Sequence, residues 1–453
     1  MTLSYCIVGG GISGLTAAYR LRLVVGESAS ITVCEPSDRL GGVLRTENVG
    51  GQPIDVGAEA FVLRRPEVPA LLAELGLADR QMSTTGARPM IYSQGRTHDL
   101  PRGTLNGIPT AAAQLVGLVD EATIARVVAE RTRPLSWRPG CDPSVAELVG
   151  DRFGEQVVAR SVDPLLAGVY AGSARSIGLR SAAPALAAEL DRGAPSLTDA
   201  ARAALPPDAD GPVFGALDGG YGVLVDELVR RSRLRWAQVA VQRLRSTDEG
   251  WELVDDEGTR RDADAVILAL PAARLPGLVA DVAPRTAAAA SRITTASSAV
   301  VALALPDGTS FPEQSGVLVA SGERLRAKAI TLSSRKWGRR GNVELVRLSF
   351  GRCGDADDIA RSASDDQLLA WAVDDLATVF DVAAEPVDFC VQRWIDAIPQ
   401  YGPGHADLVA ELRAGLPPTL AVAGCYLEGI GVPACVSAAG QAVASIVVAA
   451  VAT

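Results

Sequence analysis

Three glycines near the N-terminus have the spacing of a turn that binds nucleotide phosphates. The turn, Gly9-x-Gly11-x-x-Gly14, follows the apolar run 5–8 and opens a segment with one apolar helical face. The first glycine permits the tight bend, the second lets a pyrophosphate reach the backbone, and the third lets helix and strand pack closely. Glu35 ends the next apolar run, where a carboxylate accepts hydrogen bonds from an adenosine ribose. The pattern predicts a dinucleotide site rather than a glycine-rich turn that binds nothing.

A second glycine-containing segment indicates which dinucleotide binds. Arg39 precedes the pair Gly41 and Gly42, and a further glycine-containing stretch follows at 55–59. An arginine beside paired glycines can reach a pyrophosphate while the backbone passes close to an extended cofactor. The same residues also suit an ordinary surface turn, but their position after the nucleotide unit favours FAD over NAD.

The chain offers no convincing second fingerprint for a separate NADPH domain. The nearest candidate, 219–222, has the wrong spacing and follows no convincing strand. Electrons are therefore expected to enter from the substrate and to leave to oxygen or another acceptor.

A glycine-dense turn near the C-terminus is a further candidate for cofactor contact. It runs through 424–433, between the apolar run 420–423 and a helix of small residues. Backbone N–H groups in such a turn can meet a flavin ring. Cys425 beside Tyr426 allows a covalent flavin link, although a half-buried structural thiol is the preferred interpretation.

The elements that must position these turns alternate between strands and helices. Bounded apolar runs predict strands at 5–8, 31–34, 236–243, 251–254, 265–270, 299–305, 316–320, 343–350 and 420–423. Helical spacing predicts helices from 15 to Gly26, at 66–80, at 111–133, through most of 142–205 and at 434–450, with starts at 142–144 and 196–199. The segment 206–211 predicts a loop or boundary. The pattern indicates an α/β fold, with 299–350 in an antiparallel sheet.

Composition excludes several functional classes. Of the 453 residues 48% are apolar and 21% charged, which is enough for a large core, and the net charge of −10 argues against nucleic-acid binding. Two histidines argue against a His-rich metal site, and we predict no metal. Seven cysteines without a CxxC motif suggest free thiols in a reducing compartment. No secretory signal is evident, and the longest C-terminal apolar run, 446–452, is too short to span a bilayer. A cytoplasmic location is expected.

Seven segments, spread in order along the chain, resemble a known family. Three of them, 7–19 (IVGGGISGLTAAY), 39–42 and 57–61 (GAEAF), resemble the FAD-dependent amine oxidase and phytoene desaturase superfamily. The other four resemble more specifically the porphyrinogen oxidases of haem biosynthesis, in their Gram-positive and actinobacterial form: 163–172 (DPLLAGVYAG), 218–228 (DGGYGVLVDEL), 394–401 (WIDAIPQY) and 424–436 (GCYLEGIGVPACV).

This resemblance implies a fold and a division of the chain. The implied fold is α/β, with a Rossmann-like FAD-binding domain, a mixed-sheet substrate domain and a helical insertion. The FAD-binding domain would comprise 1–64, 206–274 and 388–453. The substrate domain would comprise 65–102 and 275–387, and the helical domain 103–205.

The resemblance also implies a reaction. Coproporphyrinogen III would be oxidised to coproporphyrin III by loss of six electrons, with three O₂ reduced to three H₂O₂ and flavin N5 as the hydride acceptor. Protoporphyrinogen IX is the alternative substrate. A ferrochelatase that takes the product is a further hypothesis, without an interface signature in the sequence. No general base is identified, and both histidines, His98 in a turn-like segment and His405 in a loop, are interpreted as structural or surface residues.

The family pattern assigns roles to individual residues of this chain. It places Gly9, Gly10, Gly11, Ile12, Ser13 and Gly14 on the pyrophosphate, and Glu35 with Pro36 at the ribose. Along the cofactor it places Arg39, Gly41 and Gly42, beside the flavin Gly57, Ala58, Glu59 and Ala60, at the adenine Val241, and around the isoalloxazine Trp394, Ile430, Gly431 and Val432. Glu59 is an acid at a position that varies in the family.

Substrate contacts follow from the chemistry of the implied substrate. Porphyrinogens are broad apolar rings edged with propionates, so a suitable pocket combines aliphatic walls with cations at its rim. The substrate-binding candidates are Arg65, Tyr170 and Lys328. Further cations close to family motifs are Arg64, Arg175, Arg335 and Lys336. For each cation a solvated surface position is the competing interpretation, and for Tyr170 a core position.

Three alternatives stay open at this point. An amine oxidase would need an aromatic cage, for which only 7 Tyr and 7 Phe are available. A carotenoid desaturase would need an apolar membrane-docking face, whereas the helical region 103–205 is rich in charge. A flavin-binding scaffold without catalytic activity would keep the flavin spectrum and lack turnover.

Overall fold

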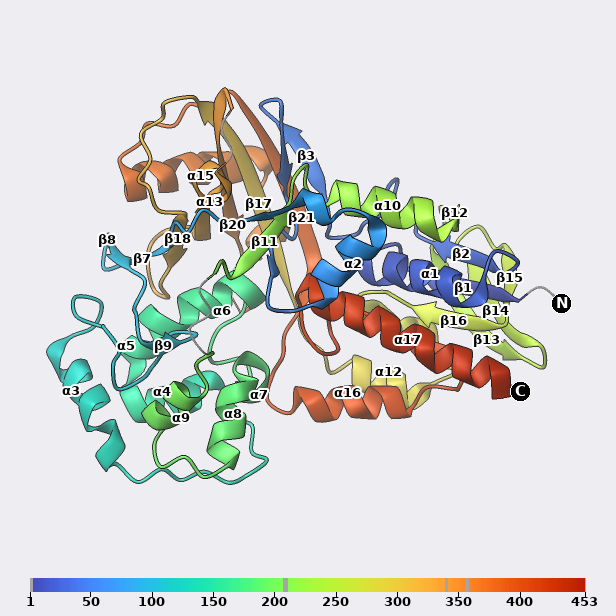
Figure 1. The fold of residues 1–453 in the computed structure, drawn as a ribbon, viewed down its shortest axis with the longest axis horizontal. Helices are drawn as coiled ribbons and strands as arrows, with labels where there is room; N and C mark the ends of the chain where they lie inside the picture. The colour runs from blue at the N-terminus through green and yellow to red at the C-terminus, as the bar shows by residue number, and fades with distance from the viewer. Residues whose placement is uncertain (1–2, 207–210, 339–340, 355–357, 453) are drawn as a thin grey trace.

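The computed structural model describes residues 3–206, 211–338, 341–354 and 358–452 (Figure 1). Most of the predicted boundary 206–211, namely 207–210, lies outside the described residues. The chain forms two large sheets and a group of helices, so the predicted α/β class is confirmed.

A five-stranded parallel sheet holds the N-terminal glycine turn. Its order is β12 (Arg235–Ala237), β2 (Ser30–Cys34), β1 (Ser4–Val8), β16 (Ala265–Leu268) and β22 (Leu420–Val422). Apolar side chains alternate between its faces. One face packs against α1 (Ile12–Val25) and α17 (Val432–Ala452). Three of the five strands come from distant parts of the sequence, so the sheet closes only when the whole chain folds.

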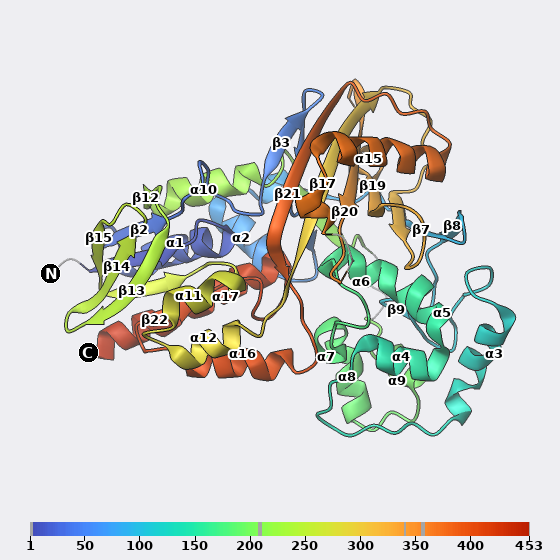
Figure 2. The ribbon, with the colours of Figure 1, turned by 180° about the vertical axis from the view of Figure 1, so that it is seen from behind.

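The opposite face of this sheet carries a meander and three helices, seen from behind in Figure 2. The meander contains β13 (Val241–Thr247), β14 (Gly250–Asp255) and β15 (Arg260–Ala263). The helices are α11 (Leu275–Val279), α12 (Pro284–Ala290) and α16 (His405–Ala414). The predicted single strand 236–243 is therefore wrong: it divides between β12 and β13, which belong to different sheets.

The second large sheet is mixed and has seven strands. Its order is β21 (Asp388–Pro399), β17 (Thr295–Pro306), β20 (Val343–Phe350), β19 (Ala327–Leu332), β18 (Gly316–Val319), β7 (Met90–Ser93) and β8 (Arg96–Asp99). Neighbours within this sheet run antiparallel except β18 and β7, so the antiparallel arrangement predicted for 299–350 is confirmed and the parallel pair is formed with a strand outside that range. The helices α14 (Ile359–Ser362) and α15 (Asp365–Phe380) cover one face, and the hairpin β3 (Thr46–Val49) and β4 (Gln52–Asp55) packs on the other.

The helical region has its own apolar core (Figure 1). Its helices are α3 (Glu121–Ala129), α4 (Val145–Phe153), α5 (Glu155–Val157), the π-turn η3 (Val158–Val162), α6 (Asp163–Tyr170), α7 (Leu179–Ala182), α8 (Pro184–Asp191) and α9 (Leu197–Ala203). The predicted starts are confirmed, because Ser144 and Ser196 accept N-cap hydrogen bonds at α4 and α9. The two-stranded β9 (Thr104–Leu105) and β10 (Ile108–Pro109) lie against α9.

Two predicted helices are shorter than expected. The segment 111–120 is irregular, with Gly117 at φ 83°, and α3 begins only after Asp120, whose side chain accepts from the Thr123 amide. The helix expected at 66–80 ends as α2 (Glu67–Leu75), because Gly76 adopts a left-handed conformation, and a separate turn η1 (Ala78–Arg80) follows.

Two other expectations need correction. The motif at 219–222 does follow a strand, β11 (Phe214–Leu217), and precedes α10 (Gly222–Ser232). That strand lies between the short strands β5 (Phe61–Val62) and β6 (Gln81–Ser83) in an antiparallel sheet, which is not the setting of a dinucleotide turn. His98 lies within the strand β8 rather than in a turn.

The division into domains stays a prediction. The strand β21 falls in the segment 388–453, and it pairs along most of its length with β17 in the seven-stranded sheet.

Candidate cofactor and substrate site

The N-terminal glycine turn is fixed by close backbone contacts. The Gly9 amide donates to the Cys34 carbonyl over 2.9 Å, which joins the ends of β1 and β2. A Cβ at Gly14 would overlap the Gly9 carbonyl oxygen, and one at Gly9 would overlap the carbonyl of Ala269. Neither position therefore admits a side chain, as the sequence pattern predicts.

The first turn of α1 faces a narrow cradle between two glycine turns. The Gly41 amide donates to the Gly10 carbonyl over 2.8 Å, so the two turns lie side by side. A Cβ built on Gly42 would stand 2.9 Å from the Gly11 Cα, whereas one on Gly11 would meet only the Gly42 Cα, at 3.9 Å. No side chain caps α1. Free helix amides beside an open cradle are the donor set that a pyrophosphate requires, and Ile12 and Ser13 lie in this first turn.

Glu35 is held in place at the end of β2. Its Oε2 accepts from the Gly10 amide over 2.9 Å, and its Oε1 accepts from the Ser37 amide and hydroxyl. Two carboxylate oxygens retain capacity for further donors, which suits ribose hydroxyls. Pro36 is exposed beside it, and Val241 is half-buried at the start of β13. These residues fit the adenosine half of a dinucleotide.

Arg39 has a more local role than the sequence suggests. Its guanidinium donates to the carbonyls of Leu40 and Leu44 at 3.2 Å each and to that of Gly42. Burial lowers the pKa of Arg39 from its usual value. The side chain therefore braces the turn that carries Gly41 and Gly42, and a direct contact with the pyrophosphate stays a prediction.

The strip 57–60 lies tightly between two other segments. A Cβ on Gly57 would overlap the Val43 carbonyl oxygen and would stand 3.0 Å from the Trp394 ring. The Ala58 amide donates to the same Val43 carbonyl, and the Trp394 indole N–H donates to the Val56 carbonyl over 2.8 Å. The structure therefore brings Trp394 against Gly57, two predicted cofactor residues from opposite ends of the chain.

Glu59 is the centre of a mostly buried polar cluster that the sequence analysis did not foresee. Its carboxylate accepts from Lys336 Nζ at 2.6 Å, Trp337 Nε1 at 3.1 Å and Ser333 Oγ at 3.3 Å, and Arg347 Nη1 lies 3.7 Å away. We call these five residues the Glu59 cluster. Burial alone raises the pKa of Glu59, but Lys336 and Arg347 outweigh burial and lower it to about 2.

The Glu59 cluster contacts the backbone of the segment 57–60, the predicted cofactor strip. Arg347 Nη2 donates to the Gly57 carbonyl, while its Nε is buried without a hydrogen-bond partner among the described residues. Lys336, a candidate rim cation, is already paired with Glu59. The missed residue is Arg347, and its signal was the one cation in the otherwise mostly apolar strand 343–350.

Asp55 lies just before the strip and has a different environment. Its carboxylate accepts from Thr46 Oγ1 at 2.6 Å and from the Tyr221 amide at 3.0 Å. Burial raises the pKa of Asp55 to about 6, although these two hydrogen bonds oppose the change. The glycine motif 219–222 therefore docks on Asp55, since a Cβ at Gly220 would stand 2.5 Å from the Thr46 side chain.

The C-terminal glycine turn is held from one side by an aromatic pair. The Tyr401 hydroxyl accepts from the Gly429 amide over 2.8 Å and donates to the Cys425 carbonyl. The His405 ring stacks on Tyr401 at 3.9 Å, and its Nε2 lies 2.8 Å from the Tyr426 carbonyl oxygen. Burial lowers the pKa of His405. His405 is thus a buried residue at the start of α16, a structural role as expected, though not in a loop.

Cys425 and the start of α17 complete this turn. Burial raises the pKa of the Cys425 thiol well above its ordinary value, which disfavours the reactive thiolate and supports the structural interpretation. Ile430 and Gly431 lead into α17, where Val432 is buried.

The substrate-binding candidates lie in unlike environments. Arg65 is 47% exposed at its side chain and pairs with Glu67 at 2.7 Å. Tyr170 donates to the Ser181 carbonyl, and its ring lies 5.9 Å from that of Tyr401, which connects it to the C-terminal turn. Lys328 is buried in the seven-stranded sheet and donates to Ser298 Oγ and to the carbonyls of Phe350 and Gly351. Arg175 pairs with Glu155, Arg335 pairs with Glu344, and Arg64 is exposed.

Metal-binding clusters and membrane-spanning helices concern other classes of function. No group of three or more His, Cys, Asp or Glu side chains among the described residues could hold a metal ion. None of the helices in that part of the chain combines the length and the apolar character needed to cross a membrane.

Comparisons with known proteins show the family to which the chain is related. The model of the family described as flavin containing amine oxidoreductase matches residues 12–447. The coproporphyrinogen III oxidase of Mycobacterium leprae is 69% identical over 440 residues, covering 97% of each chain, and that of Mycobacterium tuberculosis is 69% identical over 444 residues, covering 98% of this chain and 97% of its own. A crystal structure from Exiguobacterium sp. 255-15, provisionally called a protoporphyrinogen oxidase, superposes with a TM-score of 0.88 at 27% identity over 99% of both chains.

Proposed function

The chain belongs to the family of flavin containing amine oxidoreductases, and from that premise we propose that it is a coproporphyrinogen III oxidase of haem biosynthesis. The observation that carries this function is the 69% identity to coproporphyrinogen III oxidases over nearly the full length of both chains. The substrate is coproporphyrinogen III and the product coproporphyrin III. Protoporphyrinogen IX is proposed as a second, poorer substrate, and a ferrochelatase as the protein that takes the product.

The family implies a flavin, and we propose FAD because the site fits the whole dinucleotide. The cradle at Gly11 and Gly42 fits the pyrophosphate, Glu35 fits the ribose, and the strip 57–60 with Trp394 fits the ring. The chemistry that FAD supplies when bound is two-electron oxidation, with N5 as the hydride acceptor and O₂ as the final oxidant.

The protein's own residues orient the cofactor and the substrate. Arg347, which lies beside Glu59, donates to the Gly57 carbonyl, and Tyr401 holds the C-terminal turn. Rigid backbone at both places limits the positions that the reacting groups can adopt, which is how a protein contributes to cofactor chemistry. His405 hydrogen-bonds to the Tyr426 carbonyl and is buried, so we assign it no proton transfer with the substrate.

The macrocycle of the substrate needs apolar side chains that are exposed rather than buried in the core. Val169 on α6 is 60% exposed, and Ile395, next to Trp394 in β21, is 39% exposed. We propose that these side chains contact the ring system, while Arg65 contacts a propionate at the rim. Both segments carry motifs typical of porphyrinogen oxidases.

The function is tested by aerobic porphyrin fluorescence with purified protein. Coproporphyrinogen III and protoporphyrinogen IX are compared, with flavin-free protein as the control for auto-oxidation, and H₂O₂ is measured in parallel. We expect rapid oxidation of coproporphyrinogen III, slower oxidation of protoporphyrinogen IX and one H₂O₂ for every two electrons removed. Absence of acceleration for both substrates by protein with bound FAD would contradict the proposal.

A further inference from the structure

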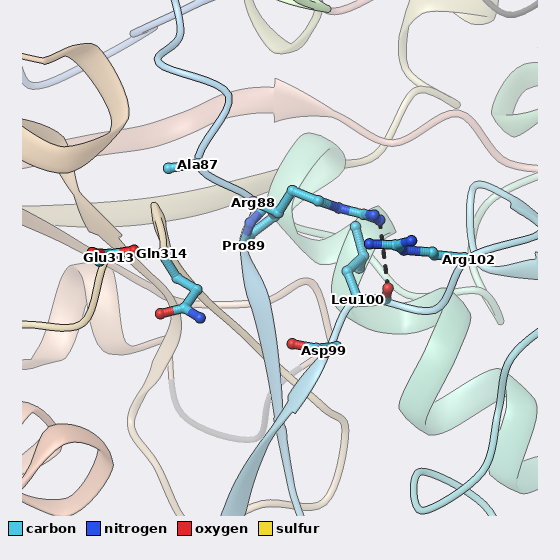
Figure 3. A pocket seen from close by; sticks show the side chains of 8 residues that line it. All are labelled: Ala87, Arg88, Pro89, Asp99, Leu100, Arg102, Glu313 and Gln314. Atoms are coloured by element: carbon cyan, nitrogen blue, oxygen red, sulfur yellow. Dashed lines mark hydrogen bonds between the residues drawn. The ribbon is translucent and has the colours of Figure 1, made fainter.

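A surface cavity of about 290 Å³ lies where β7 begins and β8 ends (Figure 3). Its lining consists of Ala87, Arg88, Pro89, Asp99, Leu100, Arg102, Glu313 and Gln314. The Ser315 amide donates to the Arg88 carbonyl, so the strands β18 and β7 fix two of its walls. None of these residues takes part in the cofactor site described above.

Two guanidinium groups meet at one end of this cavity. Arg88 and Arg102 extend toward the same place, where Arg88 Nη2 lies 3.5 Å from the Leu100 carbonyl oxygen (Figure 3). Both side chains are exposed, and neither forms an ion pair with a carboxylate of the described residues, whereas Arg80, eight positions before Arg88, pairs with Asp218. The carboxylates of Asp99 and Glu313 lie on the other side of the cavity. Because neither of these carboxylates forms an ion pair with Arg88 or Arg102 in the described part of the chain, the two guanidinium groups are available to an anion.

The apolar part of the lining favours an anion that carries an alkyl group. Ala87, Pro89 and Leu100 border the guanidinium end and offer surface to methylene groups rather than to water. A guanidinium fork matches the two oxygens of a carboxylate. The cavity volume is small for a tetrapyrrole ring and sufficient for a short alkyl chain that ends in a carboxylate.

The cavity is also joined to the Glu59 cluster by a short segment. The Thr85 amide donates to the Lys336 carbonyl at 3.0 Å, and the Thr85 hydroxyl donates to the Arg335 carbonyl at 2.8 Å. Two residues later Ala87 enters the cavity wall. The segment that lines the cavity is thus anchored on the helix that supplies Lys336 to Glu59 beside the cofactor strip.

We propose that this cavity binds an alkyl carboxylate, and that its occupant is a propionate arm of the tetrapyrrole, with Arg88 and Arg102 as the binding residues. This assignment of the occupant rests on the proposed function. A free short dicarboxylate has the same chemistry and is the other source that the experiment distinguishes.

Equilibrium binding to the flavin-loaded protein tests the proposal without turnover. The probes are coproporphyrin III, its tetramethyl ester and succinate, and the variant is the double substitution Arg88→Gln and Arg102→Gln. The matched control is Arg285→Gln, an exposed arginine of α12. We expect the double variant to weaken coproporphyrin III binding by about tenfold or more, because it removes the charge-assisted hydrogen bonds to the carboxylate. Ester binding should not change, and Arg285→Gln should behave as the unsubstituted protein.

The outcomes distinguish a tetrapyrrole propionate from a free dicarboxylate, and they distinguish failure of this site from failure of the proposed function. Loss of succinate binding in the double variant, with coproporphyrin III binding unchanged, would keep the carboxylate site and overturn the tetrapyrrole as its occupant. No effect on either probe, in a variant whose thermal unfolding matches that of the unsubstituted protein, would overturn the site itself. Because no oxidation is measured, failure of the proposed function would appear only in the turnover assay and not in these titrations.

Discussion

Two of the buried clusters that join a carboxylate with arginine or lysine in the described part of the chain are built differently. One joins Glu130 and Arg152 in the helical region, with side chains 0% and 2% exposed. The other is the Glu59 cluster, which supports the cofactor strip. Both contain a carboxylate removed from water beside a guanidinium, so their differences show what each arrangement is for.

The side chains of Glu130 and Arg152 both have several hydrogen-bond partners. Arg152 donates to the Glu130 carboxylate at 2.7 Å and to the backbone carbonyls of Glu130, Arg133 and Pro134. Glu130 also accepts from the amides of Leu197 and Thr198 and from the Thr198 hydroxyl. These bonds connect α4, α9 and the turn η2 (Glu130–Thr132), so the pair fixes how the helices pack.

The Glu59 cluster is unevenly satisfied. Two cations share one carboxylate, and Arg347 Nε is buried without a partner in the described part of the chain. The remaining capacity of Arg347 is directed at the Gly57 carbonyl. In the Glu130–Arg152 pair the buried polar atoms bond to one another and to nearby backbone, and the pair stabilises helix packing. In the Glu59 cluster one guanidinium nitrogen lacks a partner among the described residues, and Arg347 instead positions the Gly57 carbonyl.

The largest predicted effect breaks the satisfied pair. Arg152→Met leaves the Glu130 carboxylate buried without its cation, which should lower the free energy of unfolding by about 3–5 kcal/mol. Urea denaturation measures the change, and Arg202→Met, an exposed arginine on α9, is the matched control. Flavin content of the folded protein should stay unchanged. A loss below about 1 kcal/mol would show that the pair does not stabilise the helical region.

The second prediction compares Asp55 with Glu59, two carboxylates four positions apart whose pKa values move in opposite directions. Asp55 has a pKa of about 6 when folded, above its ordinary 3.8, so the folded state binds more protons between pH 4 and 6. Its contribution to stability is therefore present below about pH 4 and is lost as the pH rises to about 6. Glu59, with a pKa of about 2, contributes stability that is present above about pH 4.5 and lost in more acidic solution.

Asp55→Asn tests this sign. The stability of the unsubstituted protein relative to the variant should fall by about 3 kcal/mol between pH 4 and pH 7, at 1.36 kcal/mol per pKa unit. Urea denaturation across this range measures the difference, and Asp248→Asn, an exposed loop residue, is the control. A constant difference across the range would contradict the assignment.

The smallest effect on stability concerns the unsatisfied cluster. Glu59→Gln keeps the shape of the side chain but leaves Lys336 and Arg347 without a carboxylate, and we expect about 2 kcal/mol of lost stability. Unlike Arg152→Met, it should also weaken FAD binding by about tenfold, because Arg347 then no longer holds Gly57 in place. Flavin fluorescence titration of the apoprotein measures the affinity. Glu27→Gln, an exposed carboxylate that also pairs with an arginine, is the control. Unchanged FAD affinity would show that the cluster is structural only.

Local patterns in the sequence were sufficient to predict the nucleotide-binding unit. The spacing of Gly9, Gly11 and Gly14 and the position of Glu35 depend on sterics within one strand–turn–helix–strand unit, and β1, α1 and β2 follow that prediction. The caps at Ser144 and Ser196 are local in the same sense. Family membership followed from motifs that extend in order along the chain.

Only the tertiary structure decided which side chains hold the candidate site in place. Trp394 and Val56 are 338 positions apart, and Arg347 and Gly57 are 290 apart, yet each pair is joined by a hydrogen bond. It also turned Lys336 from a candidate substrate cation into the partner of Glu59, and it divided the expected strand 236–243 between two sheets. Local periodicity records which face of an element is apolar, but it does not record which distant element covers that face. The partners of a buried charge are therefore fixed only when the sheets and helices pack together.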